Sequence, residues 1–391
     1  MGTDRTVGLT SSTMEKLGFI RTAALALCLA IPLSAQTSPP ADQPSPAPAP
    51  ASPPTAWKLG PVDVSGMADG YYELGFNHPD DHESLLRGFD DKANQFELNE
   101  AVLTLDYAPS PVGFHLDAGF GRAFDVMASV EKDVTPMRFL KQAYIDVKPA
   151  SWKGVELDFG KFVTFASAEV IETQNNWNYS RSLLFVWCTP DYHFGMQVKA
   201  PFGSHFNFGA QWVAGWNNIV TGATYRTLGL TGAWTVSKLT WTNTYYGGPD
   251  ENTLDRGMRY LWDSVLLLNA NAKTSLYLNS DYLQDTPRLV PTYRIYGLAG
   301  AAKYQLASKL AISPRLEWMN DPSGRVTGAP QKLKEATLTG TYALASRLSL
   351  WLEFREDWSN QPFFNRGSQM GNSRTQPTLL LGMVALLRPG K

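Results

Sequence analysis

The sequence predicts an all-β protein that forms a single antiparallel transmembrane β-barrel of the outer-membrane type. Three observations support this fold class. Apolar and polar residues alternate with a period of two along most of the chain, the connections between alternating segments are by turns short and long, and a segment with the composition of a secretory signal comes first. A strand with one side toward lipid and the other toward an aqueous lumen shows this alternation.

The clearest alternating segment runs from Arg347 to Asp357. One face carries the apolar residues Leu348, Leu350, Leu352 and Phe354, and the other carries Ser349, Trp351, Glu353, Arg355 and Asp357. Successive side chains of a strand point to opposite sides, so this pattern indicates a strand with one apolar and one wet face.

Residues 1–35 are predicted to be an N-terminal extension and a signal peptide. Lys16 and Arg21 supply a positive region, residues 23–31 form a short apolar core, and Ser34-Ala35 offers small residues for cleavage. Residues 36–56 are rich in Pro and Ala, which favours an extended periplasmic linker. The transmembrane β-barrel is predicted to occupy residues 57–391.

We predict about sixteen strands, with about fourteen or eighteen as alternatives, and an even number places both ends on the periplasmic side. The predicted strands cover residues 62–76, 94–108, 112–124, 138–148, 155–163, 191–200, 205–217, 224–236, 237–248, 259–270, 273–284, 293–306, 309–320, 334–345, 347–358 and 376–388. Tight turns such as 271–272 and 307–308 alternate with longer polar connections such as 77–93 and 164–190. Outer-membrane barrels typically have short periplasmic turns and long extracellular loops.

The composition argues against several other classes of protein. A formal net charge of -2 provides no basic field for nucleic acid. After residue 35 there is no run of about 18 apolar residues, so the sequence predicts no transmembrane helix. The 12 Trp and 16 Tyr suit aromatic girdles at the membrane interfaces. Cys28 lies in the predicted signal peptide, which leaves Cys188 without an intrachain disulfide partner.

Charged side chains within the alternating strands are predicted to face the lumen. An unpaired Arg or Lys that faces lipid near the midplane costs about 2–4 kcal/mol. Barrels of about 16–18 strands leave an aqueous channel, whereas side chains fill barrels of about eight strands. The polar residues therefore either line a pore or pair with one another across a filled interior. The predicted lumen-wall residues are Asp117, Asp281, Arg315, Glu317, Glu353 and Arg355.

The connection 164–190 is the longest in the predicted barrel, and it contains acidic, basic and amide side chains. In a large barrel such a loop can fold inward and narrow the pore. We therefore predict a pore constriction that contains Glu169, Glu172 and Arg181. The alternative is an outward loop that caps the barrel.

Metal, cofactor and catalytic sites are not predicted. His78, His82 and Glu83 collect in one loop, but their spacing matches neither a closed zinc site nor a calcium-binding loop. A hydrolytic enzyme needs a positioned nucleophile and base. His115 and His205 lie near periplasmic turns, and no Ser motif accompanies His193.

Several stretches carry a family likeness, namely Phe139–Asp146, Gly160–Phe162, Glu169–Glu172 and Asn176–Phe185. With them, the chain from about residue 62 to its C-terminus resembles the β-barrel porin family described as OmpL-like. The resemblance implies an outer-membrane porin that passes small solutes, and it brings no catalytic residues. One departure concerns the C-terminus, because such barrels usually end on an aromatic residue that the barrel-assembly machinery reads, and Leu387 stands near that place here.

The sequence therefore predicts an outer-membrane porin for the passive diffusion of small hydrophilic solutes or ions through a water-filled pore. The predicted partners are outer-membrane lipids, the barrel-assembly machinery and the solutes, with a homo-oligomer left open and no nucleic acid. No cofactor or energy coupling is implied. The alternative predictions are a non-conducting structural barrel and a surface receptor or adhesin.

Overall fold

The computed structural model describes residues 56–109, 111–129, 136–220, 225–249, 257–288 and 290–388. The predicted extension and signal peptide (1–35) and nearly all of the predicted linker (36–56) lie outside these residues.

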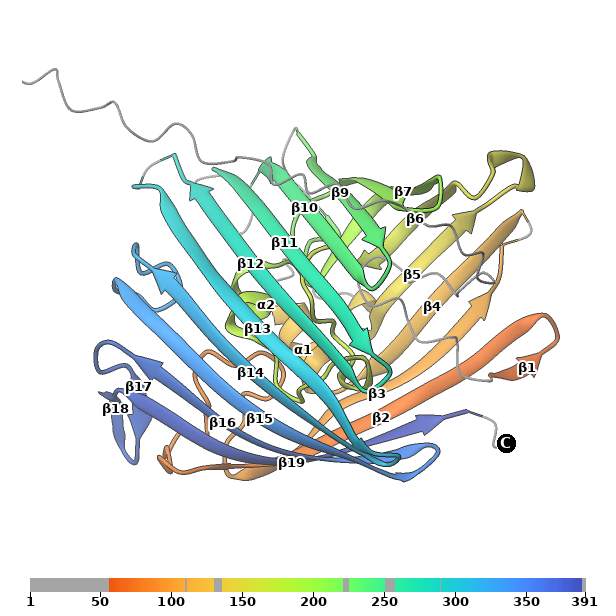
Figure 1. The fold of residues 1–391 in the computed structure, drawn as a ribbon. Coiled ribbons are helices and arrows are strands. Elements are labelled where there is room, and N and C mark those ends of the chain that lie inside the picture. The colour runs from red at the N-terminus through yellow and green to blue at the C-terminus, as the bar shows by residue number, and fades with distance from the viewer. Residues whose placement is uncertain are drawn as a thin grey trace, which may run out of the picture. The chain divides into compact units, whose positions relative to one another are not determined.

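Within the described residues, sixteen antiparallel strands close into one barrel (Figure 1). Each barrel strand pairs with the next one along the chain, and the last, β19, pairs with the first, β2. The barrel strands are β2 (Val62–Gly75), β3 (Gln95–Tyr107), β4 (Val112–Phe120), β5 (Leu140–Val147), β6 (Glu156–Val163), β7 (Tyr192–Phe202), β8 (Phe206–Val213), β9 (Thr227–Val236), β10 (Leu239–Pro249), β11 (Met258–Asn271), β12 (Thr274–Thr286), β13 (Tyr293–Ala307), β14 (Leu310–Asp321), β15 (Gln331–Ala345), β16 (Leu348–Ser359) and β19 (Thr375–Leu387). The predicted all-β barrel is confirmed.

Shorter elements accompany the barrel. The strand β1 (Trp57–Leu59) pairs with the start of β2, and β17 (Phe364–Arg366) forms a hairpin with β18 (Gln369–Ser373). The helices are α1 (Arg122–Ser129) and α2 (Leu183–Cys188), with 3-10 turns at Pro136–Phe139, Ala150–Trp152 and Thr173–Asn175. None of the helices in the described ranges is long and apolar enough to cross a membrane.

The sequence alternation becomes the two faces of the barrel wall. In β16, Leu352 is 54% exposed on the outside, whereas its neighbour Glu353 is 1% exposed on the inside. The short turns, such as Ser237-Lys238 and Ala272-Lys273, lie at the end of the barrel where β1 and the C-terminal end of β19 also lie (Figure 1). By the rule for outer-membrane barrels, this is the periplasmic end.

One predicted strand, 112–124, ends earlier than expected because a helix follows it. The strand β4 stops at Phe120 and α1 starts at Arg122. Between them Gly121 has a φ of +124°, and a Cβ there would lie 2.5 Å from the carbonyl oxygen of Asn99. Glycine tolerates both conditions, so the chain turns at this position.

The predicted strand 205–217 also ends early, since β8 stops at Val213. Phe206 and Trp212 point outward, as expected for residues that meet lipid or a neighbouring subunit. If the strand continued to residue 217 as predicted, Trp216 would share the outward face of Trp212, but it is 6% exposed and its ring packs against Tyr246 with the centroids 6.1 Å apart. The predicted end of this strand is wrong, because the chain leaves the sheet after Val213 and the alternation no longer applies.

Candidate functional site

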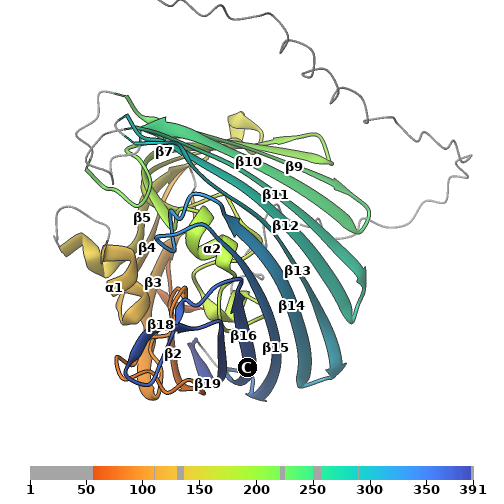
Figure 2. The same cartoon turned by 90° about the vertical axis from the view of Figure 1, so that its left-hand side faces the viewer.

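Residues 164–190, called the inward loop below, connect β6 to β7 and fold into the barrel. Figure 2 shows α2, which belongs to this loop, inside the ring of strands. Tyr179 is 1% exposed, and Leu183 and Leu184 are fully buried. The loop packs against the wall and does not cap the barrel from outside.

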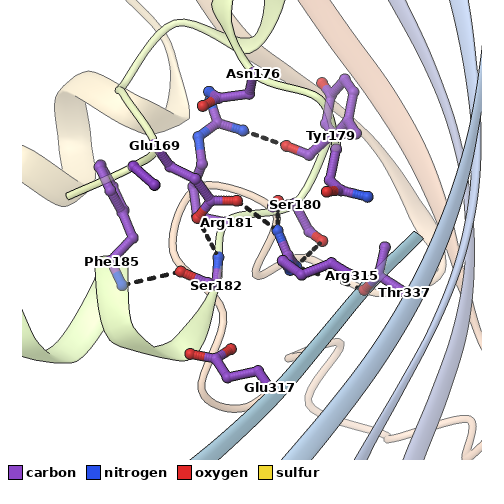
Figure 3. A network of polar contacts seen from close by, with 12 residues as sticks. Glu169, Asn176, Tyr179, Ser180, Arg181, Ser182, Phe185, Arg315, Glu317 and Thr337 are labelled. Atoms are coloured by element: carbon purple, nitrogen blue, oxygen red, sulfur yellow. Dashed lines mark hydrogen bonds and ion pairs between the residues drawn. The ribbon is translucent and has the colours of Figure 1, made fainter. Parts of the chain in front are cut away.

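Arg315 of β14 is the main ionic anchor of the inward loop (Figure 3). Its Nη1 donates to Glu169 Oε1 at 2.7 Å and to the carbonyl oxygen of Ser180 at 2.7 Å. Its Nε donates to Glu335 of β15 at 3.0 Å. Removing one partner of a buried ion pair typically costs about 3–5 kcal/mol, so these contacts bind the loop firmly to the wall.

Two charged residues of β16 bind the backbone of the inward loop. Glu353 accepts hydrogen bonds from the N–H of Tyr179 at 2.6 Å and from the N–H of Ser180 at 3.0 Å. Arg355 donates to the carbonyl oxygen of Arg181 at 2.7 Å. Backbone groups that leave water must find other partners, and these wall charges supply them.

The first turn of α2 meets a wall carboxylate. Glu317 of β14 accepts hydrogen bonds from the N–H of Leu183 at 2.6 Å and from the N–H of Leu184 at 2.7 Å. The Ser182 hydroxyl accepts a bond from the N–H of Phe185 at 3.1 Å. These contacts satisfy donors that lack partners at the start of a helix.

An apolar patch of the inner wall receives α2, although we expected inner positions to be polar. A Cβ at Gly297 of β13 would lie 2.8 Å from a side-chain carbon of Leu184, so this glycine allows the helix to approach the wall closely. The cluster joins Leu183, Leu184 and Cys188 of α2 to Leu261, Leu283, Ile295, Met319 and Leu333 of the wall.

The inward loop also binds the wall on the strands around β2. The Tyr179 hydroxyl donates to Asp69 at 2.7 Å, and the ring covers Gly382 of β19, where a Cβ would lie 2.4 Å from a ring carbon. Burial, and then the Asp69 carboxylate, raise the pKa of the Tyr179 phenol well above its usual range. The phenol is therefore a hydrogen-bond donor at physiological pH.

The inward loop reaches both sides of the barrel. Glu172 pairs with Lys141 of β5 at 2.5 Å, whereas the N–H of Ala168 donates to Asn279 of β12 at 3.0 Å. In the closed order of strands, β5 and β12 lie on opposite sides. The loop therefore crosses the lumen.

Arg181, predicted to lie in the constriction, organises the loop itself. It is 1% exposed, and its guanidinium donates to the carbonyl oxygens of Val170, Ile171 and Tyr179. Its guanidinium carbon also lies 5.5 Å from the centroid of the Phe89 ring. All the carbonyls belong to the inward loop, so Arg181 holds its two arms together.

The other two predicted constriction residues differ from each other. Glu169 is buried, and its carboxylate accepts bonds from Arg315 at 2.7 Å and from the N–H of Ser182 at 2.7 Å. Glu172 is partly exposed beside Lys141. The structure therefore brings Glu169 and Arg181 into the body of the loop and leaves Glu172 at its surface.

The six predicted lumen-wall residues fall into two groups. Asp117 of β4 pairs with His115 at 3.1 Å, and Asp281 of β12 accepts a hydrogen bond from Asn279 at 3.0 Å and lies directly opposite Asp263 of β11. Within the described residues, neither carboxylate forms a hydrogen bond or ion pair with the inward loop. The residues that bind the loop are Arg315, Glu317, Glu353 and Arg355.

A second connection, between β2 and β3, also enters the site. Arg87 pairs with Asp90 at 2.8 Å and with Asp357 of β16 at 3.1 Å, and Phe89 packs against Phe185 of α2 at 6.2 Å. Burial alone would lower the pKa of Arg87. The nearby carboxylates, with Asp357 as the strongest, have the larger effect, so the pKa of Arg87 is raised. This connection covers the extracellular side of the inward loop.

Sequence reasoning did not single out Asp69, Lys141 and Glu335. A signal existed for Glu335, because it alternates with inward threonines and lies opposite Glu317 in the register of β14 and β15. For Asp69 and Lys141 the pattern shows only an inward charge, and their partners lie in a loop whose path no alternation reveals.

An unfilled cavity lies in the lumen beside this packed region. A cavity of about 390 Å³ lies between the inward loop and the periplasmic halves of β10–β13, near the turn Ala272-Lys273. Its wall includes Trp177 of the loop and Tyr277 and Lys303 of the barrel.

Comparisons with known proteins agree with this architecture. The family model described as "Putative beta-barrel porin-2, OmpL-like" matches residues 61–387. A search of curated proteins found no match.

Solved structures of outer membrane proteins share the fold. The anion-selective porin from Comamonas acidovorans has a TM-score of 0.61 at 11% identity, over 83% of this chain and 99% of that chain. The outer membrane channel DcaP of Acinetobacter baumannii has a TM-score of 0.55 at 11% identity, over 85% and 99% of the chains. The trimer form of OmpT from Vibrio cholerae has a TM-score of 0.53 at 11% identity, over 83% and 98%.

Proposed function

Because this chain belongs to the family described as "Putative beta-barrel porin-2, OmpL-like" and is an outer-membrane channel for the passive diffusion of small solutes, we propose that the inward loop narrows its lumen and sets the size of the solutes that pass. The family match confirms the resemblance and the porin predicted from the sequence. A barrel of about 16 strands leaves an aqueous channel unless other parts of the chain occupy it.

The observation that supports this proposal is the attachment of the inward loop to the wall. Arg315, Glu317 and Glu353 each bind the loop from inside the barrel, and all three are at most 5% exposed. A loop held by buried charges keeps one position, so the remaining passage keeps one width. Solutes then cross down their gradients and are selected by that width and by the exposed charges.

The predicted constriction residues receive different roles in this proposal. Glu172 lies at the surface of the inward loop and would face the passage beside Lys141. Glu169 and Arg181 would act indirectly, by holding the loop in its position. Asp117 would contribute charge on the same side of the barrel, on the neighbouring strand β4, where it pairs with His115.

A liposome-swelling assay with neutral sugars of increasing size tests the proposal. We expect small sugars to enter and larger ones to be excluded. Arg315→Leu should let larger sugars enter, because it removes the cation that Glu169 and Glu335 share and so loosens the loop from the wall. Arg294→Leu is the matched control, since Arg294 is exposed on β13. A folded barrel that admits no sugar would favour the structural or receptor alternative, and an unchanged size limit in Arg315→Leu would refute the role of the loop.

We also propose that the chain carries no enzymatic activity. Within the described residues, the partners of His115 are Asp106, Asp117 and Gln142, and His193 bonds a backbone carbonyl. A hydrolase would instead place a base beside a hydroxyl or thiol nucleophile. Assays of lipase and protease activity on the reconstituted protein should therefore give the background rate.

We propose further that copies of the chain associate through the outer face of β8–β11. Exposed indoles cluster there, and Trp234 and Trp241 lie directly opposite each other in the register of β9 and β10. The OmpT similarity adds an outer membrane protein of this fold whose trimer form was solved. Native mass spectrometry of the detergent-solubilised protein should show an oligomer that Trp234→Ala weakens, and a monomer at all concentrations would contradict this.

A further inference from the structure

A row of polar side chains on three adjacent strands faces the open cavity. Asn269 of β11 lies opposite Ser275 of β12, which lies opposite Lys303 of β13. Two residues further along β12, the Tyr277 ring packs against Trp177 of the inward loop with the centroids 5.0 Å apart. The cavity therefore has a polar side with a cation and an aromatic side.

The charge on the cavity wall is positive. Lys273 and Lys303 both line it, and the lining carboxylate, Glu169, is held by Arg315 at 2.7 Å. Lys303 is half-buried, and it makes no ion pair or hydrogen bond with any other residue in the described ranges. A partly desolvated ammonium group without a counter-ion favours an anionic ligand.

Hydrogen-bond donors predominate among the lining groups that have no partner in the described part of the chain. The Asn269 carbonyl oxygen already accepts a bond from Ser275 at 2.8 Å, which leaves the amide nitrogen. The Asn175 amide and the Trp177 indole N–H add further donors. Gln305 donates to two backbone carbonyls at 2.6 and 3.2 Å, which leaves its amide oxygen as an acceptor for a hydroxyl.

We propose that this cavity binds a small hydroxylated carboxylate, a sugar acid, during its passage through the pore. The carboxylate pairs with Lys303, the hydroxyls bond the amides of Asn269 and Gln305, and the carbon skeleton lies against Trp177. A cavity of about 390 Å³ lies within the range of small-molecule sites. The inference rests on the proposed function, because the solute reaches the cavity through the channel.

Saturation-transfer NMR of the full chain in detergent, with gluconate as the probe, tests the site. We expect binding of gluconate and about tenfold weaker affinity in Lys303→Gln, with most of the affinity restored in Lys303→Arg, because one charge-assisted contact is lost and regained. Lys309→Gln is the matched control, since Lys309 is exposed in the next turn and does not line the cavity. Glucose, which lacks the carboxylate, should bind at least about tenfold more weakly than gluconate.

Several results would overturn the proposal. Equal affinity of the wild type and Lys303→Gln for gluconate would show that Lys303 does not bind the ligand. Equal affinity for glucose and gluconate would show that the site does not recognise a carboxylate. Displacement of gluconate by inorganic phosphate at equal concentration would show that the cavity binds anions in general and not sugar acids.

Single-channel recording of the same protein and variants separates this inference from the proposed function. A conducting channel with no Lys303-dependent gluconate binding would refute the sugar-acid site and leave the porin intact. Gluconate binding that depends on Lys303 in a barrel that never conducts would support the site and refute the channel. In a conducting wild type, gluconate should also reduce the open-channel current, and Lys303→Gln should reduce this block about tenfold.

Discussion

The inner wall of β14–β16 around Arg315 and Glu353 and the inner wall of β11–β13 near the periplasmic end both carry polar side chains, but the inward loop covers the first and a cavity lies in front of the second. On the first wall, Arg315 and Glu353 are at most 1% exposed and bind the inward loop. On the second, Ser275 and Lys303 remain partly exposed and line the cavity. A polar residue that faces the lumen is thus a pore residue only where no loop covers it.

The difference lies in the partners that each wall faces. Backbone N–H and C=O groups of the inward loop need partners once they leave water, and the charges of β14–β16 provide them. Near the periplasmic turns the loop presents Trp177 and Asn175, which leave the facing cation without a counter-charge. The first wall positions the loop, and the second meets the solute.

Glu353→Ala should have the largest effect on the difference between the two walls, because it removes a main attachment of the loop to the first wall. It leaves the N–H groups of Tyr179 and Ser180 unsatisfied, at a cost of about 1–3 kcal/mol each, so the loop should detach from the wall. Single-channel conductance should rise severalfold. Glu356→Ala on the same strand is the control, because Glu356 alternates to the outer face. Equal conductance in both variants would show that the loop does not limit the current.

Gly382→Ala should have a smaller effect of the same kind. A methyl group there would lie 2.4 Å from the Tyr179 ring, and overpacking typically costs about 1–3 kcal/mol. The ring should shift and the conductance should become noisier. Gly340→Ala is the control, since the nearest atom to a Cβ there is 3.9 Å away. Conductance traces that match in the two variants would indicate that Tyr179 is not fixed in the passage.

The two walls also show how much of the fold and of the candidate site could be predicted from the sequence. The period of two located every barrel strand, because a wall between lipid and water imposes it at each position. The same rule named Arg315 and Glu353 as inward residues, but it could not show that a loop covers them. It failed for Leu261 and Ile295, which are apolar and inward because they receive α2.

Helical segments were the other part that the alternation could not locate. In α1 the buried residues Phe124 and Met127 are three positions apart, which is a helical spacing that a search for strands passes over. In α2 the six residues Leu183–Cys188 are too few to show a period. Its position depends on Glu317, more than 130 positions later in the chain, so no local pattern predicts it.

Cys188 provides the mildest test, because it reports the position of the loop without changing it. Burial raises the pKa of the Cys188 thiol, so the reactive thiolate is scarce. In the folded wild type, maleimide should react at least about tenfold more slowly than in the unfolded chain. In Glu353→Ala the rate should rise toward the unfolded value. Rapid labelling of the wild type would mean that α2 does not stay packed on the wall.

Substituted-cysteine accessibility tests the difference between the two walls most directly. The test uses a background in which Cys28→Ala and Cys188→Ala remove the native thiols. Ser275→Cys would place a thiol in the open cavity, and Ser313→Cys would place one under the loop. Ser313 is 1% exposed, and its carbonyl oxygen accepts a hydrogen bond from the side chain of Asn178 at 2.9 Å. A small anionic thiol reagent added during single-channel recording should reduce the current of Ser275→Cys and leave that of Ser313→Cys unchanged. Equal modification rates at the two positions would show that the loop does not cover β14, and would contradict the division of the lumen into a wall that holds the loop and a wall that meets the solute.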